Sequence, residues 1–347
     1  MKVISVVNQK GGCGKTTLAV NVAAALARTG NETLLIDLDP QAHATFAMGF
    51  REKISDIKTS YDIFRSRLEN ENVLPQELLL TNRQNLDFMP ANMLLSAAEI
   101  NLGSVDGGAT ILSQYLSDPF FLKYDYVIID SPPSFGFLTL NSMYSADMIV
   151  VPMDLSYFSF NGVDSIYRVT GLLNKETGKQ PDVFFALNIF DGRSNFAKDL
   201  AKDAEAKLGR NLFGTRIRSS VRLREASMLG KTIFEHDAKC NGSIDFYNLT
   251  CELINLDKKG LDTVMREFVL RAPKAGQVYV LGDFNGWKKT ENNRLTKNDD
   301  EKWSVHLSLR KGKYRYKYMV DGHWLHDPDN SEVETNIFGS VDSILSV

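Results

Sequence analysis

The chain has 347 residues, with 40 Lys and Arg against 43 Asp and Glu, which gives a formal net charge of −3. A typical domain takes about 150 residues, so this length predicts about two domains with sizeable cores. The balanced charge excludes overall basicity as a sign of nucleic acid or membrane binding, and no apolar run approaches the roughly 18 residues of a membrane helix. Three cysteines without a pattern argue against a disulfide framework and a zinc site. The apolar run after Lys2 is too short for a secretory signal, so we expect a cytoplasmic protein.

The first 256 residues alternate between strand and helix patterns, as a mainly parallel sheet flanked by helices requires. Short apolar runs predict strands at residues 3–8, 32–37, 126–130, 148–152 and 183–188. Longer stretches with the helical period predict helices at residues 18–27, 94–101, 109–116, 162–174 and 195–208. The polar segment 49–84 has neither pattern, and we interpret it as helix or loop.

The pattern changes after Gly260. Short, often alternating apolar runs predict strands at residues 268–272, 277–282, 302–309, 313–320 and 343–347. Turn residues such as Asn285-Gly286 and Asp321-Gly322 separate them. We therefore predict a small all-β immunoglobulin-like sandwich at residues 266–347, joined through a linker at 257–265 to a first domain at 1–256.

A glycine-rich loop lies between the first predicted strand and the first predicted helix. Its sequence is Lys10-Gly11-Gly12-Cys13-Gly14-Lys15-Thr16-Thr17. Glycines let backbone N–H groups converge on phosphate oxygens, and the helix N-terminus adds its positive dipole. Lys15 would reach the β- and γ-phosphates, and the Thr16 hydroxyl would bind Mg²⁺. The loop predicts an α/β P-loop NTPase domain that binds ATP and Mg²⁺.

The loop departs from the general pattern because a second lysine, Lys10, opens it. Lys-Gly-Gly-x-Gly-Lys-Thr resembles the deviant Walker A motif of the ParA/MinD group of dimeric ATPases. The resemblance implies that Lys10 reaches the phosphates of a partner protomer across a nucleotide-sandwich dimer. A cation supplied in trans stabilises charge only after assembly, so Lys10 would couple dimerisation to the nucleotide.

Acidic residues follow two of the predicted strands. Asp37 and Asp39 lie in Leu-Ile-Asp-Leu-Asp-Pro-Gln, and Asp130 ends Tyr-Val-Ile-Ile-Asp. By resemblance, Asp37 supports the Mg²⁺ shell, Asp39 orients the attacking water, and Asp130 contacts Mg²⁺ directly or through water. Carboxylates at the C-terminal ends of parallel strands face the crevice where a ligand lies. Each Asp alone is also a common cap or turn former.

The end of this domain resembles the ParA branch more than MinD. Asn188 ends a strand where the family places a base-contacting residue. An arginine-rich stretch resembles the region with which ParA-type proteins bind DNA nonspecifically, and its candidates are Arg216, Arg218, Arg222 and Arg224. The alternative is a solvated face paired with neighbouring acids. The family's Pro-Arg is replaced by Arg218-Ser219, which leaves the adenine contacts open.

The C-terminal segment contains Gly-Asp-Phe-Asn-Gly-Trp around Trp287 and Tyr-Lys-Tyr-Met-Val-Asp-Gly-His-Trp ending at Trp324. It resembles the glycogen-binding module of AMP-activated protein kinase β-subunits, a family 48 carbohydrate-binding fold. The resemblance implies that Trp287 and Trp324 stack on sugar rings and that Lys317 donates to a hydroxyl. Asp342 stands where the family has asparagine, so it can accept but not donate. The alternative is that both tryptophans are core residues.

Together these features predict a dimerising partition or positioning ATPase that hydrolyses ATP slowly and carries a module for an α-glucan such as glycogen. The resemblance implies an ATP-dependent homodimer, nonspecific binding to nucleoid DNA, a ParB-like activator protein and no membrane partner. One alternative is a conventional partition ATPase whose β module docks another protein. Another is a metabolic phosphotransferase or ligase regulated by glucan. We expect a cytoplasmic protein that is associated with the nucleoid when ATP is bound.

Overall fold

The computed structural model describes residues 1–50, 57–154, 160–259, 263–285, 287, 289–290, 293–297, 301–310, 312–336 and 339–347. The chain divides into two compact units, Met1–Leu253 and Ile254–Val347. No helix within these ranges is both long and apolar enough to cross a bilayer.

The first unit is built on a seven-stranded sheet with the order β3-β4-β2-β5-β1-β6-β7. All neighbouring strands are parallel except the edge strand β3, which is antiparallel to β4. The strands are β1 (Lys2–Val6), β2 (Thr33–Asp37), β3 (Leu80–Arg83), β4 (Leu86–Met89), β5 (Tyr126–Asp130), β6 (Met148–Met153) and β7 (Asp182–Leu187). The central strands β2 and β5 are buried throughout, which explains their continuous apolar sequences.

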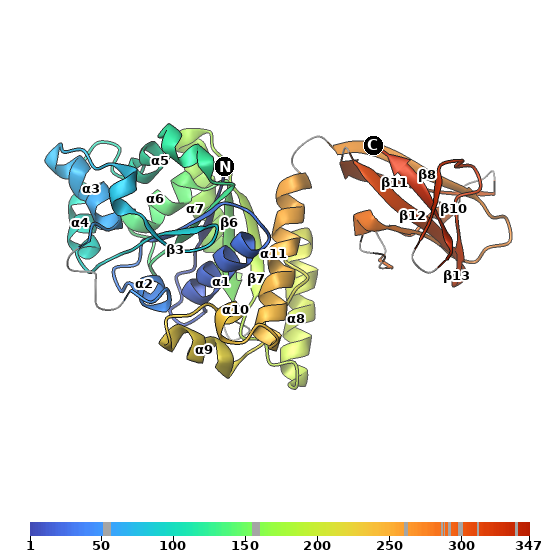
Figure 1. The fold of residues 1–347 in the computed structure, drawn as a ribbon, viewed down its shortest axis with the longest axis horizontal. Coiled ribbons are helices and arrows are strands. Elements are labelled where there is room, and N and C mark those ends of the chain that lie inside the picture. Colours follow the sequence, from blue (N-terminus) through green and yellow to red (C-terminus); the bar gives the residue numbers. More distant parts are fainter. Residues whose placement is uncertain are drawn as a thin grey trace. The chain divides into compact units, whose positions relative to one another are not determined.

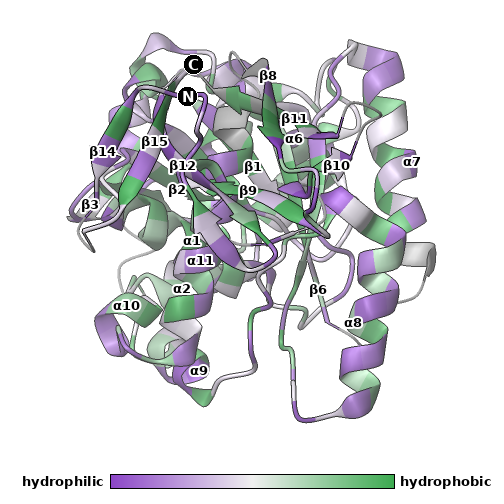
Figure 2. Ribbon diagram, turned by 90° about the vertical axis from the view of Figure 1, so that its right-hand side faces the viewer, coloured by the Kyte–Doolittle hydropathy of each residue, from purple (hydrophilic) through white to green (hydrophobic). Residues whose placement is uncertain are grey.

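Helices cover the sheet (Figure 1). They are α1 (Lys15–Arg28), α2 (His43–Ala47), α3 (Ser60–Glu69), α4 (Leu95–Leu102), α5 (Ile111–Tyr115), α6 (Phe137–Ser145), α7 (Phe160–Thr177), α8 (Asn195–Leu208), α9 (Val221–Met228), α10 (Ile233–His236) and α11 (Asn241–Lys259). Helix α8 shows why such segments fold as surface helices: hydrophilic and hydrophobic residues alternate along its turns (Figure 2), and Ala197, Ala201 and Ala204 form its buried face.

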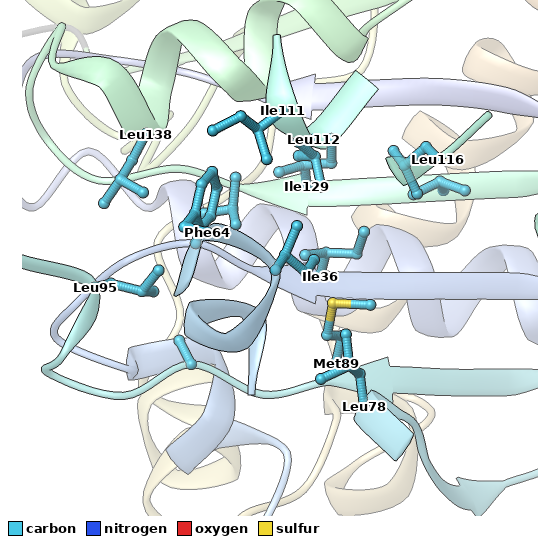
Figure 3. Packing of buried hydrophobic residues seen from close by; sticks show 14 of the residues in the cluster. Ile36, Phe64, Leu78, Met89, Leu95, Ile111, Leu112, Leu116, Ile129 and Leu138 are labelled. Carbon is cyan, nitrogen blue, oxygen red and sulfur yellow. The ribbon is translucent and has the colours of Figure 1, made fainter. Parts of the chain in front are cut away.

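A hydrophobic core joins the sheet to helices α3 to α6. Ile36 of β2 and Ile129 of β5 meet Phe64 of α3 and Leu138 of α6 in this core (Figure 3). All four side chains are fully buried. Because side chains alternate between the faces of a strand, Leu35 of β2 points to the opposite face, where α1 packs on β2 and β5.

The predicted elements agree closely with the structure where the hydrophobic pattern is strong. Strand β5 and helix α8 have the predicted bounds. Segment 49–84, interpreted as helix or loop, contains helix α3 and the edge strand β3, and its residues 51–56 lie outside the described ranges. The prediction also missed β4, α6 and the helices from α9 to α11. Of these, β4, α9 and α10 have only four to eight residues, too few for a clear periodicity.

The predicted linker at 257–265 needs correction. Helix α11 continues to Lys259 and strand β8 begins at Thr263, so both ends of the predicted linker have regular secondary structure. Residues 260–262 lie outside the described residues. The charged run before Gly260 suggested a linker, but lysines such as Lys258 and Lys259 also suit the last turn of a helix.

The second unit contains two antiparallel sheets. One has the order β10-β11-β8; the other has the order β13-β12-β15-β14, with β9 paired to β12. Their strands are β8 (Thr263–Arg271), β9 (Val278–Gly282), β10 (Thr296–Lys297), β11 (Lys302–Arg310), β12 (Lys313–Val320), β13 (His323–Leu325), β14 (Val333–Thr335) and β15 (Val341–Ser346). Phe268 and Trp303 from the first sheet and Val280 and Tyr318 from the second share one core, which confirms the predicted sandwich.

Candidate functional site

The glycine-rich loop lies between β1 and α1, as predicted. Gly12 and Gly14 have φ values of 77° and 86°, which favour glycine. A Cβ atom on Gly14 would lie 2.2 Å from Nδ2 of Asn188. That amide nitrogen donates to the Cys13 carbonyl oxygen at 2.8 Å. Asn188, expected to contact the base, thus braces the loop from the end of β7, and the close approach requires glycine at position 14.

Two lysines of the loop have different surroundings. The Lys15 side chain is buried, and its Nζ donates to the carbonyl oxygen of Lys10 at 3.3 Å. Nζ of Lys10 lies 2.9 Å from each carboxylate oxygen of Asp154, just after β6. In this single chain, the lysine expected to act on a partner protomer therefore forms an ion pair within its own protomer.

A cavity of about 890 Å³ opens over the loop. The backbone and side chains of Gly11, Gly12, Gly14, Lys15, Thr16 and Thr17 form one wall. Cys13 does not line it; the thiol is buried and donates to the Lys10 carbonyl oxygen. Asp39, Gln41 and Asn188 also reach the cavity. Its size suits a nucleotide, whose sites commonly measure about 300–1,000 Å³.

Asp37 and Asp130 are neighbours on adjacent strands, β2 and β5. Oδ2 of Asp37 accepts from the backbone N–H and the hydroxyl of Thr45, and Oδ1 accepts from the N–H of Asp39. Burial nevertheless raises the pKa of Asp37 to about 7. Asp37 does not line the cavity, so its carboxylate anchors helix α2 and the chain that carries Asp39.

Asp130 differs because the neighbouring Thr16 hydroxyl lowers the pKa of its carboxylate without meeting it in full hydrogen-bond geometry. Both oxygens are buried without a hydrogen-bond partner among the described residues. Burial and the charge of Asp37 outweigh the effect of Thr16 and raise the pKa of Asp130 well above its usual value. Asp130 does not line the cavity either, but its two orphaned carboxylate oxygens lie near Thr16 and Lys15 of the loop. They fit a divalent cation, which would supply the missing partner. Within the described ranges no group of three or more His, Cys, Asp or Glu could hold a metal by itself.

The arginines predicted to bind DNA have different environments. Arg216 pairs with Glu205 and lies over the Phe190 ring. Arg218 forms a bidentate pair with the buried Asp245, with Nη2 and Oδ1 2.6 Å apart. Arg222 pairs with Glu225 and Asp237. Arg218 and Arg224 line the cavity over the phosphate loop.

The second unit has its own cavity of about 690 Å³. Trp287, Lys317, Trp324 and Asp342 all line it, so the structure brings the four predicted carbohydrate residues together. The two indole rings lie edge to face with centroids 5.9 Å apart, and Trp324 is 50% exposed. They are therefore not core residues; Trp303 takes that role. Nε1 of Trp287 donates to Asp283, which fixes one ring.

The polar floor of this cavity is an ion pair. Nζ of Lys317 lies 2.9 Å from Oδ1 of Asp342, and both side chains are buried. Lys317 also donates to the Ser340 hydroxyl at 2.8 Å, and Asn336 donates to Asp342 at 2.8 Å. Among the described residues none donates to Oδ2 of Asp342, so this oxygen remains available to a ligand hydroxyl.

The chain resembles proteins of known families in both units. Residues 1–183 match the family described as AAA domain. The chain is 33% identical to "Chromosome partitioning protein ParA" of Myxococcus xanthus over 259 residues, covering 74% of this chain and 89% of the relative. It is 33% identical to "Sporulation initiation inhibitor protein Soj" of Bacillus subtilis, covering 73% and 98%. The chain belongs to the ParA family. This ParA-family ATPase carries a second module, because residues 268–347 match the glycogen recognition site of AMP-activated protein kinase.

Solved structures share the fold of the first unit. "Cobyrinic Acid a,c-diamide synthase" from Mycobacterium smegmatis, with a bound ATP analog and magnesium, has a TM-score of 0.63 at 26% identity, covering 75% of this chain and 97% of that chain. Apo McdA of Cyanothece has a TM-score of 0.64 at 23% identity, with 73% and 99% covered, and shows the shared fold. Structures of such relatives thus hold ATP-type nucleotides with Mg²⁺.

Sequence reasoning missed Asp154, Thr45 and the neighbours of the sugar cavity. Asp154 lies beyond β6, 144 positions from Lys10, and no local pattern connects the two. Thr45 and Asn336 act through hydrogen bonds to predicted carboxylates. The one available signal was Asp154 following the end of a parallel strand, where site residues gather.

Proposed function

We propose that this ParA-family ATPase binds MgATP, dimerises around it, and positions an α-glucan, such as a glycogen particle, on nucleoid DNA. One observation supports the combination: a single chain has a cavity over a phosphate loop that opens with a second lysine, Lys10, and another cavity lined by two tryptophans. Slow hydrolysis would return the dimer to monomers and release the DNA.

Each residue of the nucleotide site would have a distinct role. The loop N–H groups and Lys15 would hold the phosphates, while Asn188 keeps the loop in place. Thr16 and Asp130 would hold Mg²⁺, with Asp37 beside them; the bound ion neutralises phosphate charge. Asp39 lines the cavity, and its Oδ1 accepts from the N–H of Gln41. That bond leaves its other oxygen to orient the attacking water.

Lys10 would connect nucleotide binding to dimerisation. In the single chain its ammonium pairs with Asp154, with 31% and 17% of the two side chains exposed. A partly exposed pair contributes up to about 1 kcal/mol, so a partner's triphosphate can compete for the ammonium. In the dimer, Lys10 would leave the Asp154 carboxylate and contact the partner's triphosphate instead. ATP would therefore favour the dimer, whereas ADP, which lacks the third phosphate, would not.

The sandwich site has the chemistry of a sugar site. The apolar faces of glucose rings would stack on Trp287 and Trp324, which lie edge to face and so suit a curved chain. Lys317 would donate to one hydroxyl, and Asp342 Oδ2 would accept from a neighbouring one. A donor beside an acceptor matches two adjacent hydroxyls of one sugar.

The proposed DNA contacts would come from the arginine-rich stretch at residues 216–224. Arg216, Arg218 and Arg222 are paired with acids. Of these three, Arg222 is the most exposed, with 56% of its side chain accessible, and is the best candidate for a phosphate contact. Such contacts form only if DNA phosphates replace the acidic partners, so binding should weaken steeply with salt.

Sedimentation with ATP or ADP, each with and without DNA or glycogen, tests the proposal. We expect a dimer with ATP only, and co-sedimentation of that dimer with both polymers. Lys10→Ala should bind ATP but stay monomeric, and a double Trp287→Ala/Trp324→Ala variant should lose glycogen only. A module that docks a protein instead would leave wild type and the tryptophan variant equally unbound to glycogen.

A further inference from the structure

Helix α9 presents one side to the nucleotide cavity. Ser220, at its N-cap, and Leu223, Arg224, Ser227 and Met228 all line this cavity. The spacing of three and four residues places these five positions on one helical face. Arg222 and Glu225 do not line the cavity and pair with each other instead. Arg224 thus occupies the same face of α9 as the residues that close the cavity.

Arg224 also differs from the other three arginines of this stretch because it has no carboxylate partner among the described residues. Arg216, Arg218 and Arg222 each have a carboxylate partner. In the described part of the chain, no residue forms an ion pair, hydrogen bond or ring contact with the Arg224 guanidinium. The other cations of the cavity wall are already engaged: Lys15 with the Lys10 carbonyl oxygen, and Arg218 with Asp245.

A nucleoside di- or triphosphate would bring several negative charges into this cavity. The guanidinium is always charged, and its fork of N–H donors matches phosphate oxygens. We infer that Arg224 is a nucleotide-binding residue whose guanidinium contacts the phosphate chain of the nucleotide in its own protomer, rather than a DNA-binding residue. The inference rests on the proposed nucleotide site.

Calorimetric titration with MgADP and with adenosine tests this assignment, because ADP avoids the dimerisation that ATP would cause. Loss of one charge-assisted hydrogen bond should weaken MgADP binding about tenfold in Arg224→Ala. Adenosine, which has no phosphate, should bind wild type and variant equally. Arg224→Lys keeps the charge and should lose less than Arg224→Ala. Arg222→Ala, on another face of the same helix, is the matched control and should stay within about twofold of wild type.

Three results would overturn the inference. MgADP affinity of Arg224→Ala could equal that of wild type. Adenosine affinity could fall as much as MgADP affinity, which would place the guanidinium on the base or ribose. Retention of a nonspecific duplex could fall while MgADP affinity holds, which would assign Arg224 to DNA. If Arg224→Ala does not fold, Arg224→Gln provides the same comparison. Failure of wild type to bind MgADP would instead refute the proposed nucleotide site.

Discussion

The chemical behaviour of individual charged residues in this protein depends more on their bonding partners than on their positions in the sequence. Asp37 and Asp130 lie side by side on β2 and β5, yet one carboxylate is fully bonded and the other has no bond within the described residues. Lys317 and Asp342 form a buried pair in the sandwich. The stability of the protein should therefore depend on pH through the two aspartates, and on substitution through the Lys317–Asp342 pair.

The two buried carboxylates should make the metal-free protein less stable as the pH rises. Burial raises the pKa of Asp37 to about 7 and raises that of Asp130 as well, from an unfolded value of 3.8. Between these values the folded chain holds protons that the unfolded chain has released, so the free energy of unfolding falls as the pH rises through this window. Thermal melts in EDTA from pH 4.5 to 7.5 should show this fall.

The control for this pH effect is Asp130→Asn, which cannot ionise. The variant should show a shallower dependence of melting temperature on pH than wild type. Added MgADP should also flatten the wild-type dependence, because a bound cation stabilises the ionised carboxylates. An equally steep dependence in wild type and Asp130→Asn would contradict the assignment to this pair.

Breaking the Lys317–Asp342 pair should destabilise the sandwich. The side chains are only 9% and 4% exposed, so Lys317→Met leaves a carboxylate buried without its counter-charge. We expect a loss of about 3 kcal/mol in the free energy of unfolding of this unit. The double variant Lys317→Met/Asp342→Leu removes both charges and should recover most of that loss without recovering glycogen binding. Urea unfolding and a glycogen pull-down separate the two effects, and equal stability of single and double variants would contradict this view.

At the scale of elements, the strand–loop–helix unit of β1 and α1 is the most constrained. Helix α1 begins at Lys15 with a left-handed residue, Gly14, at its N-cap. Both the backbone conformation and the nearby amide of Asn188 at the end of β7 exclude a side chain there. Strand β7 therefore determines the loop's shape, although it is far away in the sequence.

Gly14→Ala should both destabilise the first unit and prevent nucleotide binding. The added Cβ would meet Nδ2 of Asn188 at 2.2 Å, and the positive φ adds strain of roughly 1 kcal/mol. Gly11→Ala is the matched control, because nothing lies within 4 Å of its Cβ position and its φ is not positive. Thermal melts of the nucleotide-free variants should show a lower melting temperature for Gly14→Ala only. Similar melting temperatures for the two variants would mean that the loop can rearrange around the added methyl group.

At the scale of the whole molecule, the protein consists of two units with separate cores. Buried apolar residues of the first unit run from Val3 to Leu253, and those of the second unit begin at Phe268. Each unit also contains one of the two cavities. Because the two units have separate cores, we expect each unit to unfold in its own transition.

Calorimetry of the full chain should show two transitions that respond to different ligands. A ligand at about 100 times its Kd stabilises the unit that binds it by about 2.7 kcal/mol. MgADP should raise the melting temperature of the first unit only, and a soluble α-glucan that of the second only. A single transition shifted by either ligand would show that the two units unfold together.

The sequence alone determined the features that depend on local order. The phosphate loop, the continuous apolar runs of β5 and β6, and the spacing of α8 are set by neighbours along the chain, so local patterns were sufficient to find them. The same holds for the change to alternating strands after Gly260. Edge strand β3 and the short β4 were missed because they owe their structure to pairing rather than to their own periodicity.

Only the tertiary structure decided which charges meet. Lys10 pairs with Asp154, 144 positions away in the chain. The Thr45 hydroxyl bonds to Asp37 from the neighbouring helix α2, and Arg224 of α9 lines the same cavity as the phosphate loop. The tertiary structure also showed that Trp287 and Trp324 line a cavity while Trp303 fills the core. Ion pairing and burial depend on distances in space, and a sequence carries that information only through the fold.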